Sequence, residues 1–133
     1  MVNSSKRINI RSGAPWETRV GYSRAVRVGN FIAVSGTAAV DAHGELVGAG
    51  NAYLQAQRCI EIIRLALQQA GGELRHVIRT RIFVTDISLW EDIGRAHQEA
   101  FADIAPATSM VEVRQLIDPG MLVEIEADAL LVD

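Results

Sequence analysis

The sequence predicts an α+β domain in which two amphipathic helices cover one face of a β-sheet. Apolar residues recur at the helical period between residues 51 and 70, and again between residues 90 and 104. Runs that suit β-strands lie before, between and after these two stretches. Two helices with apolar stripes must bury them against a common apolar surface, so both are expected on the same face of the sheet.

Composition indicates a single globular domain over residues 1–133. The chain is 49% hydrophobic and 22% charged, which is ordinary for a domain with a real core. A net charge of −3 without a basic patch argues against a nucleic-acid partner. Cys59 is the single cysteine, so no intramolecular disulfide can form, which favours a reducing compartment. With no signal-peptide pattern and no run approaching the ~20 apolar residues that span a bilayer, we expect a cytoplasmic protein without a membrane partner.

The N-terminal third is predicted to be a strand, a loop and a hairpin. Residues 1–6 are polar and are expected to be loosely held. Residues 7–11 alternate and indicate a short edge strand, whereas Gly, Pro and Trp in residues 12–21 indicate a loop. Residues 24–35 read as a hairpin around a Gly-Asn turn. Phe31–Val34 is apolar without alternation, so this strand is expected to be central and covered on both faces.

Two helices and a strand follow. The stripe of the first helix consists of Ala52, Ala56, Cys59, Ile60, Ile63, Leu67 and Ala70, and a Gly-Gly pair ends it. Gln55 is expected on another face. In the strand at 78–85, Ile78, Ile82 and Val84 are expected opposite Arg79 and Arg81. A capping box from Ser88 to Glu91 predicts the start of the second helix, with a stripe of Trp90, Ile93, His97, Phe101 and Ile104.

The C-terminal segment, Pro106–Leu131, is predicted to be a hairpin. Two alternating runs flank the turn signal at residues 118–120. The simplest register places Arg114 opposite Glu126 and Glu112 opposite Asp128. Together with Arg79, Arg81 and Glu124, these residues would give the uncovered sheet face charges of both signs. Another subunit is the simplest partner for such a face.

This segment also resembles the closing hairpin of the YjgF/RidA family, also called L-PSP endoribonuclease-like. The matching motifs are Pro-Ala-x-Ser-x-Val-x-Val from residue 106 and Val-Glu-Ile-Glu-Ala from residue 123. Upstream, Gly-Tyr-Ser-x-Ala-Val from residue 21, Gly-Asn at 29–30, Ser-Gly at 35–36 and Phe-Val-Thr-Asp from residue 83 also match. The resemblance implies a chorismate-mutase-like α+β fold with a mixed sheet. It also implies a homotrimer with small-molecule clefts between neighbouring subunits.

The same resemblance implies a chemistry that needs no cofactor. Family members hydrolyse reactive enamine and imine intermediates to a 2-keto acid and ammonia. The glutamate that positions the hydrolytic water corresponds to Glu124. Tyr22, Ser35, Thr108 and Met110 are the candidate substrate-binding residues. Thr108 occupies the position of the family arginine that grips the substrate carboxylate.

Thr108 is a chemically significant departure from the family pattern. A guanidinium offers a charged, bidentate fork to a carboxylate, whereas threonine offers one neutral hydroxyl. Arg114 lies six residues further along, roughly 20 Å away in a strand, and is expected to pair with Glu126 instead. The sequence therefore predicts weak hydrolysis of small 2-imino acids unless another group supplies the cation.

Three functions remain open on the sequence. The chain could be a RidA-like hydrolase with a non-standard substrate, or a non-catalytic binder of small metabolites in the same clefts. An endoribonuclease is disfavoured because an acidic strand suits neither phosphate neutralisation nor acid–base attack at a 2′-hydroxyl. His43, His76 and His97 lack ligand spacing, so no metal site is predicted. Cys59, on a buried helix face, is expected to be inert.

Overall fold

A computed structural model describes residues 6–132, and the expectation for residues 1–5 lies outside this range. The strands are β1 (Arg7–Ile10), β2 (Ala25–Val28), β3 (Phe31–Ala38), β4 (Val77–Val84), β5 (Ala107–Glu112) and β6 (Val123–Leu130). The helices are α1 (Pro15–Val20), α2 (Ala52–Gln69) and α3 (Trp90–Phe101), with the short 3-10 turns η1 (Leu74–His76) and η2 (Ile87–Leu89). The predicted α+β class is confirmed.

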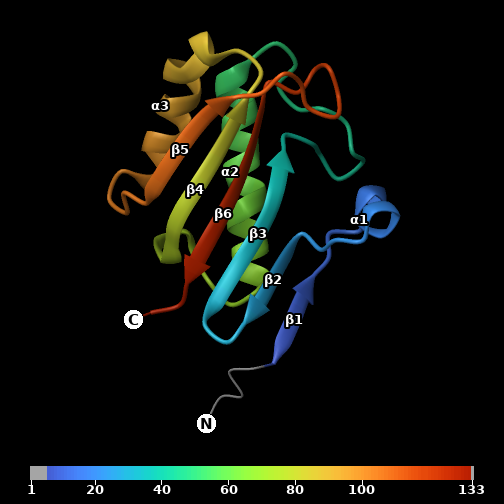
Figure 1. Cartoon of the computed structure of the whole chain (residues 1–133), viewed down its shortest axis with the longest axis vertical. Helices are drawn as coiled ribbons and strands as arrows, with labels where there is room; N and C mark the ends of the chain where they lie inside the picture. Colours follow the sequence, from blue (N-terminus) through green and yellow to red (C-terminus); the bar gives the residue numbers. More distant parts are fainter. Residues whose placement is uncertain (1–5, 133) are drawn as a thin grey trace.

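The strands form one mixed sheet in the order β1-β2-β3-β6-β4-β5. Helices α2 and α3 lie on the same side of this sheet (Figure 1). The core fills the layer between the sheet and these two helices. In this layer, Ile32, Ile63, Ile82, Ile93 and Ile125 are almost fully buried. Within residues 6–132 no helix covers the opposite face of the sheet, and we call it the open face. No helix of the described chain is both long and apolar enough to cross a membrane.

The N-terminal hairpin forms as predicted, but the preceding loop contains a helix. β2 and β3 pair antiparallel around the Gly-Asn turn, with Val28 opposite Phe31. Segment 12–21 was expected to be irregular, yet α1 forms there because Pro15 begins the helix and Gly21 ends it at a φ of 89°. The buried carboxylate of Glu17 accepts hydrogen bonds from the backbone N–H and the hydroxyl of Ser12. That contact ties α1 back to the end of β1.

Helix α2 confirms the prediction at 51–70. The Asn51 side chain accepts a hydrogen bond from Leu54 N at 3.0 Å and caps the helix. All members of the predicted stripe are buried. The prediction for Gln55 was wrong, because its side chain is also buried. Its amide nitrogen donates to the carbonyl oxygens of Gly48 and Gly120, and its amide oxygen accepts from Leu122 N at 2.9 Å. A fully satisfied amide can occupy a core position that its polarity alone would exclude.

The predicted start of the second helix was wrong in detail. Asp86, rather than Ser88, acts as the cap: its carboxylate accepts from Ser88 N at 2.9 Å and from the Ser88 hydroxyl at 2.7 Å. Asp86 thereby begins the 3-10 turn η2, which directly precedes α3. Trp90 therefore lies at the first position of α3 and is 55% exposed, outside the buried stripe. Ile93 and Phe101 are buried as expected.

The predicted C-terminal hairpin was also wrong. β5 pairs parallel with β4, and β6 pairs antiparallel with both β3 and β4, so β4 separates the two runs. Arg114 lies beyond the end of β5, and Glu112 instead accepts a hydrogen bond from Ile87 N at 3.0 Å. The connection 113–122 is long enough to pass over β4. With β4 between β5 and β6, both edges of β4 are paired. A β5–β6 hairpin would leave one edge of β4 unpaired.

Two further expectations about strands need correction. β3 is central, but only one of its faces is covered within the chain, since Ile32 and Val34 are buried while Phe31 is 42% exposed. The reason is that α2 and α3 share one side of the sheet. In β4, the pairing with β6 is irregular between Val77 and Arg79. This irregularity buries Val77 and leaves Ile78 exposed, reversing the expected side for Ile78.

Candidate functional site

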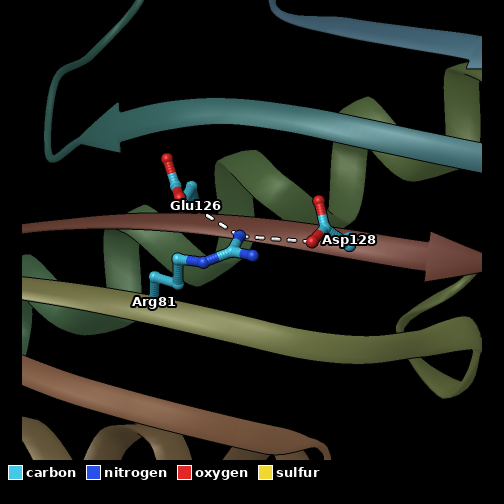
Figure 2. Close-up of polar contacts among 3 residues, drawn as sticks. All are labelled: Arg81, Glu126 and Asp128. Carbon is cyan, nitrogen blue, oxygen red and sulfur yellow. Dashed lines mark hydrogen bonds and ion pairs between the residues drawn. The ribbon is translucent and has the colours of Figure 1, made fainter.

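On the open face, Arg81 pairs with two acidic residues. Its Nη1 lies 3.2 Å from Glu126 Oε1 and 3.2 Å from Asp128 Oδ2. Figure 2 shows the guanidinium reaching from β4 toward these two carboxylates of β6, on the side of the sheet away from α2. The cation expected at this place was Arg114, and the structure corrects it to Arg81. Because all three side chains are partly exposed, the pairs add at most about 1 kcal/mol each in the single chain.

A bulge interrupts β3 beside these acids. Val34 pairs with Ala127 and Thr37 pairs with Ile125, so Ser35 and Gly36 together stand opposite one residue of β6. The Thr37 hydroxyl donates to Ser35 O at 2.7 Å, and the Ser35 hydroxyl donates to Ser23 O at 2.7 Å. These bonds hold the bulge in shape. Bulges of this kind redirect side chains at the edges of sites.

Glu124 occupies the space that the bulge leaves open. A Cβ on Gly36 would lie 2.6 Å from Glu124 Oε2, so only glycine leaves room for the carboxylate in this position. Burial is the largest effect and raises the pKa of Glu124, the Arg24 charge opposes this rise, and the Glu126 charge adds to it. A carboxylate with a raised pKa is a better proton acceptor, which is what a group that activates water requires.

Arg24 lies near this carboxylate, and Tyr22 lies beside Arg24. Arg24 Nη2 donates to Gly36 O at 2.6 Å, and the Arg24 Cζ lies 5.7 Å from the centroid of the Tyr22 ring. Ser35 is adjacent, since its backbone N–H donates to Arg24 O at 3.0 Å. The predicted residues Tyr22, Ser35 and Glu124 therefore lie around Arg24 and Gly36. We call these three residues, with Arg24 and Gly36, the Glu124 cluster.

Thr108 and Met110 are not part of this cluster within one chain. Both lie on β5, which is separated from β6 by β4. The Thr108 hydroxyl lies 2.8 Å from the hydroxyl of Thr80, which in turn lies 2.8 Å from His97 Nε2. Thr80 is buried under α3, so Thr108 points toward the helix-covered side of the sheet, opposite to Glu124. Met110 packs partly against the core.

Other candidate chemistry is limited. In the part of the chain that the structure describes, no group of three His, Cys, Asp or Glu residues could hold a metal ion. His97, the histidine nearest to a predicted site residue, has its pKa lowered by burial and contacts Thr80. Burial raises the pKa of Cys59 to about 12, so its thiol stays protonated and is a poor nucleophile.

Sequence reasoning missed two members of the Glu124 cluster. Gly36 was a motif match without a role, and Arg24 was left without a function. The available signal was spacing: Arg24 follows Tyr22 by two residues just before a strand, which favours placement on the same side. The close approach of Gly36 to Glu124 joins two segments far apart in the chain, and no local pattern reports such a contact.

Comparisons with known proteins agree with this architecture. The family described as Endoribonuclease L-PSP matches residues 13–131. An uncharacterised protein of Streptomyces coelicolor, SCO2049, is 34% identical over 90% of this chain and 89% of its own. The 3-aminoacrylate deaminase RutC of Acinetobacter baylyi is 32% identical over 81% of this chain and 85% of its own.

A solved structure extends the agreement to three dimensions. The crystal structure of Rv2704 from Mycobacterium tuberculosis, described as a member of the YjgF/YER057c/UK114 family, is 48% identical. It matches with a TM-score of 0.85 over 95% of this chain and all of its own. The mixed sheet, the two helices on one face and these matches together establish that the chain belongs to the YjgF/RidA family.

Proposed function

We propose that this protein binds small metabolites at the Glu124 cluster and hydrolyses a carbon–nitrogen double bond there. The observation that carries the proposal is the half-buried carboxylate of Glu124, held over Gly36 with its pKa raised by burial. The deaminase named among the relatives supports this reaction class. No cofactor is needed, because water is the only co-reactant.

The reaction balances with the groups present. Glu124 accepts a proton from water as the oxygen bonds to the carbon of the C=N bond, forming a carbinolamine. Glu124 passes this proton to the nitrogen, which gives a neutral carbinolamine. Glu124 then moves the hydroxyl proton of the carbinolamine to the nitrogen as the C–N bond breaks, so that ammonia leaves and the C–O bond becomes the carbonyl of the product. A general base placed in this way typically contributes ~10²- to 10⁴-fold to the rate.

We also propose a homotrimer in which the open face is an interface between subunits. Exposed apolar side chains lie on this face beside the charges of Arg81, Glu126 and Asp128: Val28, Phe31, Val111 and Leu130. Apolar patches rimmed by charge are typical of protein interfaces. In such an assembly the site would lie in a cleft between subunits, where the edge strand β5 of one subunit borders the Glu124 cluster of its neighbour.

The test is ammonia and keto-acid release from imines generated by an amino-acid oxidase. The wild-type protein should exceed the uncatalysed rate for at least one of a neutral, an acidic and a basic amino acid. Glu124→Gln should lose ~10²- to 10⁴-fold of that activity. Glu91→Gln, on the exposed first turn of α3, is the matched control and should leave the rate unchanged.

One outcome would favour a different function. If the intact wild-type assembly accelerates none of these imines, yet keto acids bind to it, the protein is a non-catalytic metabolite binder. Crystals soaked with 2-oxobutyrate would then show the ligand at the Glu124 cluster without turnover.

A further inference from the structure

Arg24 has an unused hydrogen-bond donor inside the Glu124 cluster. Its Nη2 is bound to Gly36 O, but its Nε is buried and has no hydrogen-bond partner. Within residues 6–132 it is the only buried side-chain nitrogen or oxygen in this state. A buried donor without a partner is costly, and a guanidinium is the costliest kind because it carries a charge. The Arg24 side chain as a whole is only partly buried, so an anion can reach the guanidinium through its exposed atoms.

Among the described residues, the positive charge of Arg24 also has no ion-pair partner. Across the described residues, its guanidinium takes part in none of the ion pairs. Arg81, on the same sheet, has two carboxylates within 3.2 Å. Arg24 influences Glu124 through its field, yet the two do not form an ion pair. The cation is therefore available to an anion other than Glu124.

Gly36 fixes the spacing between this cation and the catalytic carboxylate. Its carbonyl oxygen holds Arg24 Nη2, and its missing side chain makes the space for Glu124 Oε2. The ring of Tyr22 lies 5.7 Å from the guanidinium carbon and limits its movement on another side. An anion bound by Arg24 would thus lie beside the water that Glu124 activates.

We propose that Arg24 binds the anionic group of the substrate, a carboxylate adjacent to the C=N bond, and so replaces the arginine that is absent at position 108. This inference rests on the proposed function and assigns one residue, Arg24, to the acid group of the substrate. Arg24 would then be the group that supplies the cation in place of the arginine missing at position 108. The substrate acid group then lies on the β2–β3 side of Glu124 rather than at β5.

The test compares a keto acid with its neutral analogue. Binding of 2-oxobutyrate and of 2-oxobutanamide is measured by calorimetry on the full-length wild type, Arg24→Gln, Arg24→Lys and Arg114→Gln. Wild type should prefer the acid. Arg24→Gln should lose roughly 10- to 150-fold in affinity for the acid, the range for a hydrogen bond to a charged group, and little for the amide. Arg24→Lys should recover part of the loss because it keeps the charge.

The control variant and the outcomes separate the two proposals. Arg114 is exposed beyond β5, so Arg114→Gln should bind both compounds as wild type does. Light scattering and circular dichroism confirm that each variant keeps its assembly and fold. If Arg24→Gln binds 2-oxobutyrate as tightly as wild type, the role of Arg24 is refuted while metabolite binding stands. If wild type binds neither compound, metabolite binding of this class is refuted, and the role of Arg24 falls with it.

Discussion

At the scale of single residues, Gly36 determines where the carboxylate of Glu124 can lie. Gly36→Ala would place a methyl group 2.6 Å from Glu124 Oε2, so the carboxylate must rotate away. We expect imine hydrolysis to fall at least tenfold while the protein remains folded, as measured by kcat/KM and circular dichroism. Activity equal to wild type would show that the carboxylate position does not matter for catalysis.

Gly94 offers a matched control for that substitution. It lies within α3, and an added Cβ there would meet nothing within 4 Å. Gly94→Ala should leave hydrolysis unchanged. It should also raise the free energy of unfolding by roughly 0.5–1 kcal/mol, because alanine favours the helix. A loss of activity in this variant would mean that the effect of Gly36→Ala is not specific to the site.

The titration of Glu124 gives a further residue-scale prediction. A general base must be ionised, and burial raises the pKa of Glu124 above its ordinary value of 4.5. We expect kcat/KM to fall as the pH drops through this raised pKa, beginning at a higher pH than for an exposed glutamate. Since the Arg24 charge lowers the pKa, Arg24→Gln should move the acidic limb upward. A limb that does not move would contradict the coupling between the two groups.

At the scale of elements, α2 supplies much of the core. Ile63 is fully buried between α2 and the sheet. Truncation by Ile63→Ala should lower the free energy of unfolding by roughly 2–5 kcal/mol, because it removes buried methyl groups and leaves a cavity. Urea denaturation measures this change. Gln68→Ala, on the exposed side of the same helix, should change stability by less than about 0.5 kcal/mol.

The elements also show how far sequence reasoning reaches. Periodicity located α2, the β2–β3 hairpin and the stripe of α3, because each reports on burial along one segment. It failed for β5 and β6, since two alternating runs near a turn signal cannot reveal that β4 lies between them. Strand neighbours depend on contacts across the chain. The same limit explains why Arg24 and Gly36 became visible as site residues only in three dimensions.

At the scale of the whole molecule, the open face predicts assembly. Light scattering should give about three times the chain mass of 14.5 kDa. Arg81→Glu would place three acidic side chains together on this face, and like charges at short range repel. We expect this variant to dissociate. Arg64→Glu, on the outer side of α2, should remain assembled. A wild-type monomer at micromolar concentration would remove the proposed cleft.

The position of β6 has a consequence for how the chain reaches its native state. β6 is the last strand in sequence, yet it joins β3 to β4 in the middle of the sheet. Until residues 123–130 have left the ribosome, β1-β2-β3 and β4-β5 are two separate pieces with unpaired inner edges. Such edges are templates for association with other chains. The sheet can therefore close only after β6 has emerged, and in the interval before β6 inserts the edges of β3 and β4 are open to other chains.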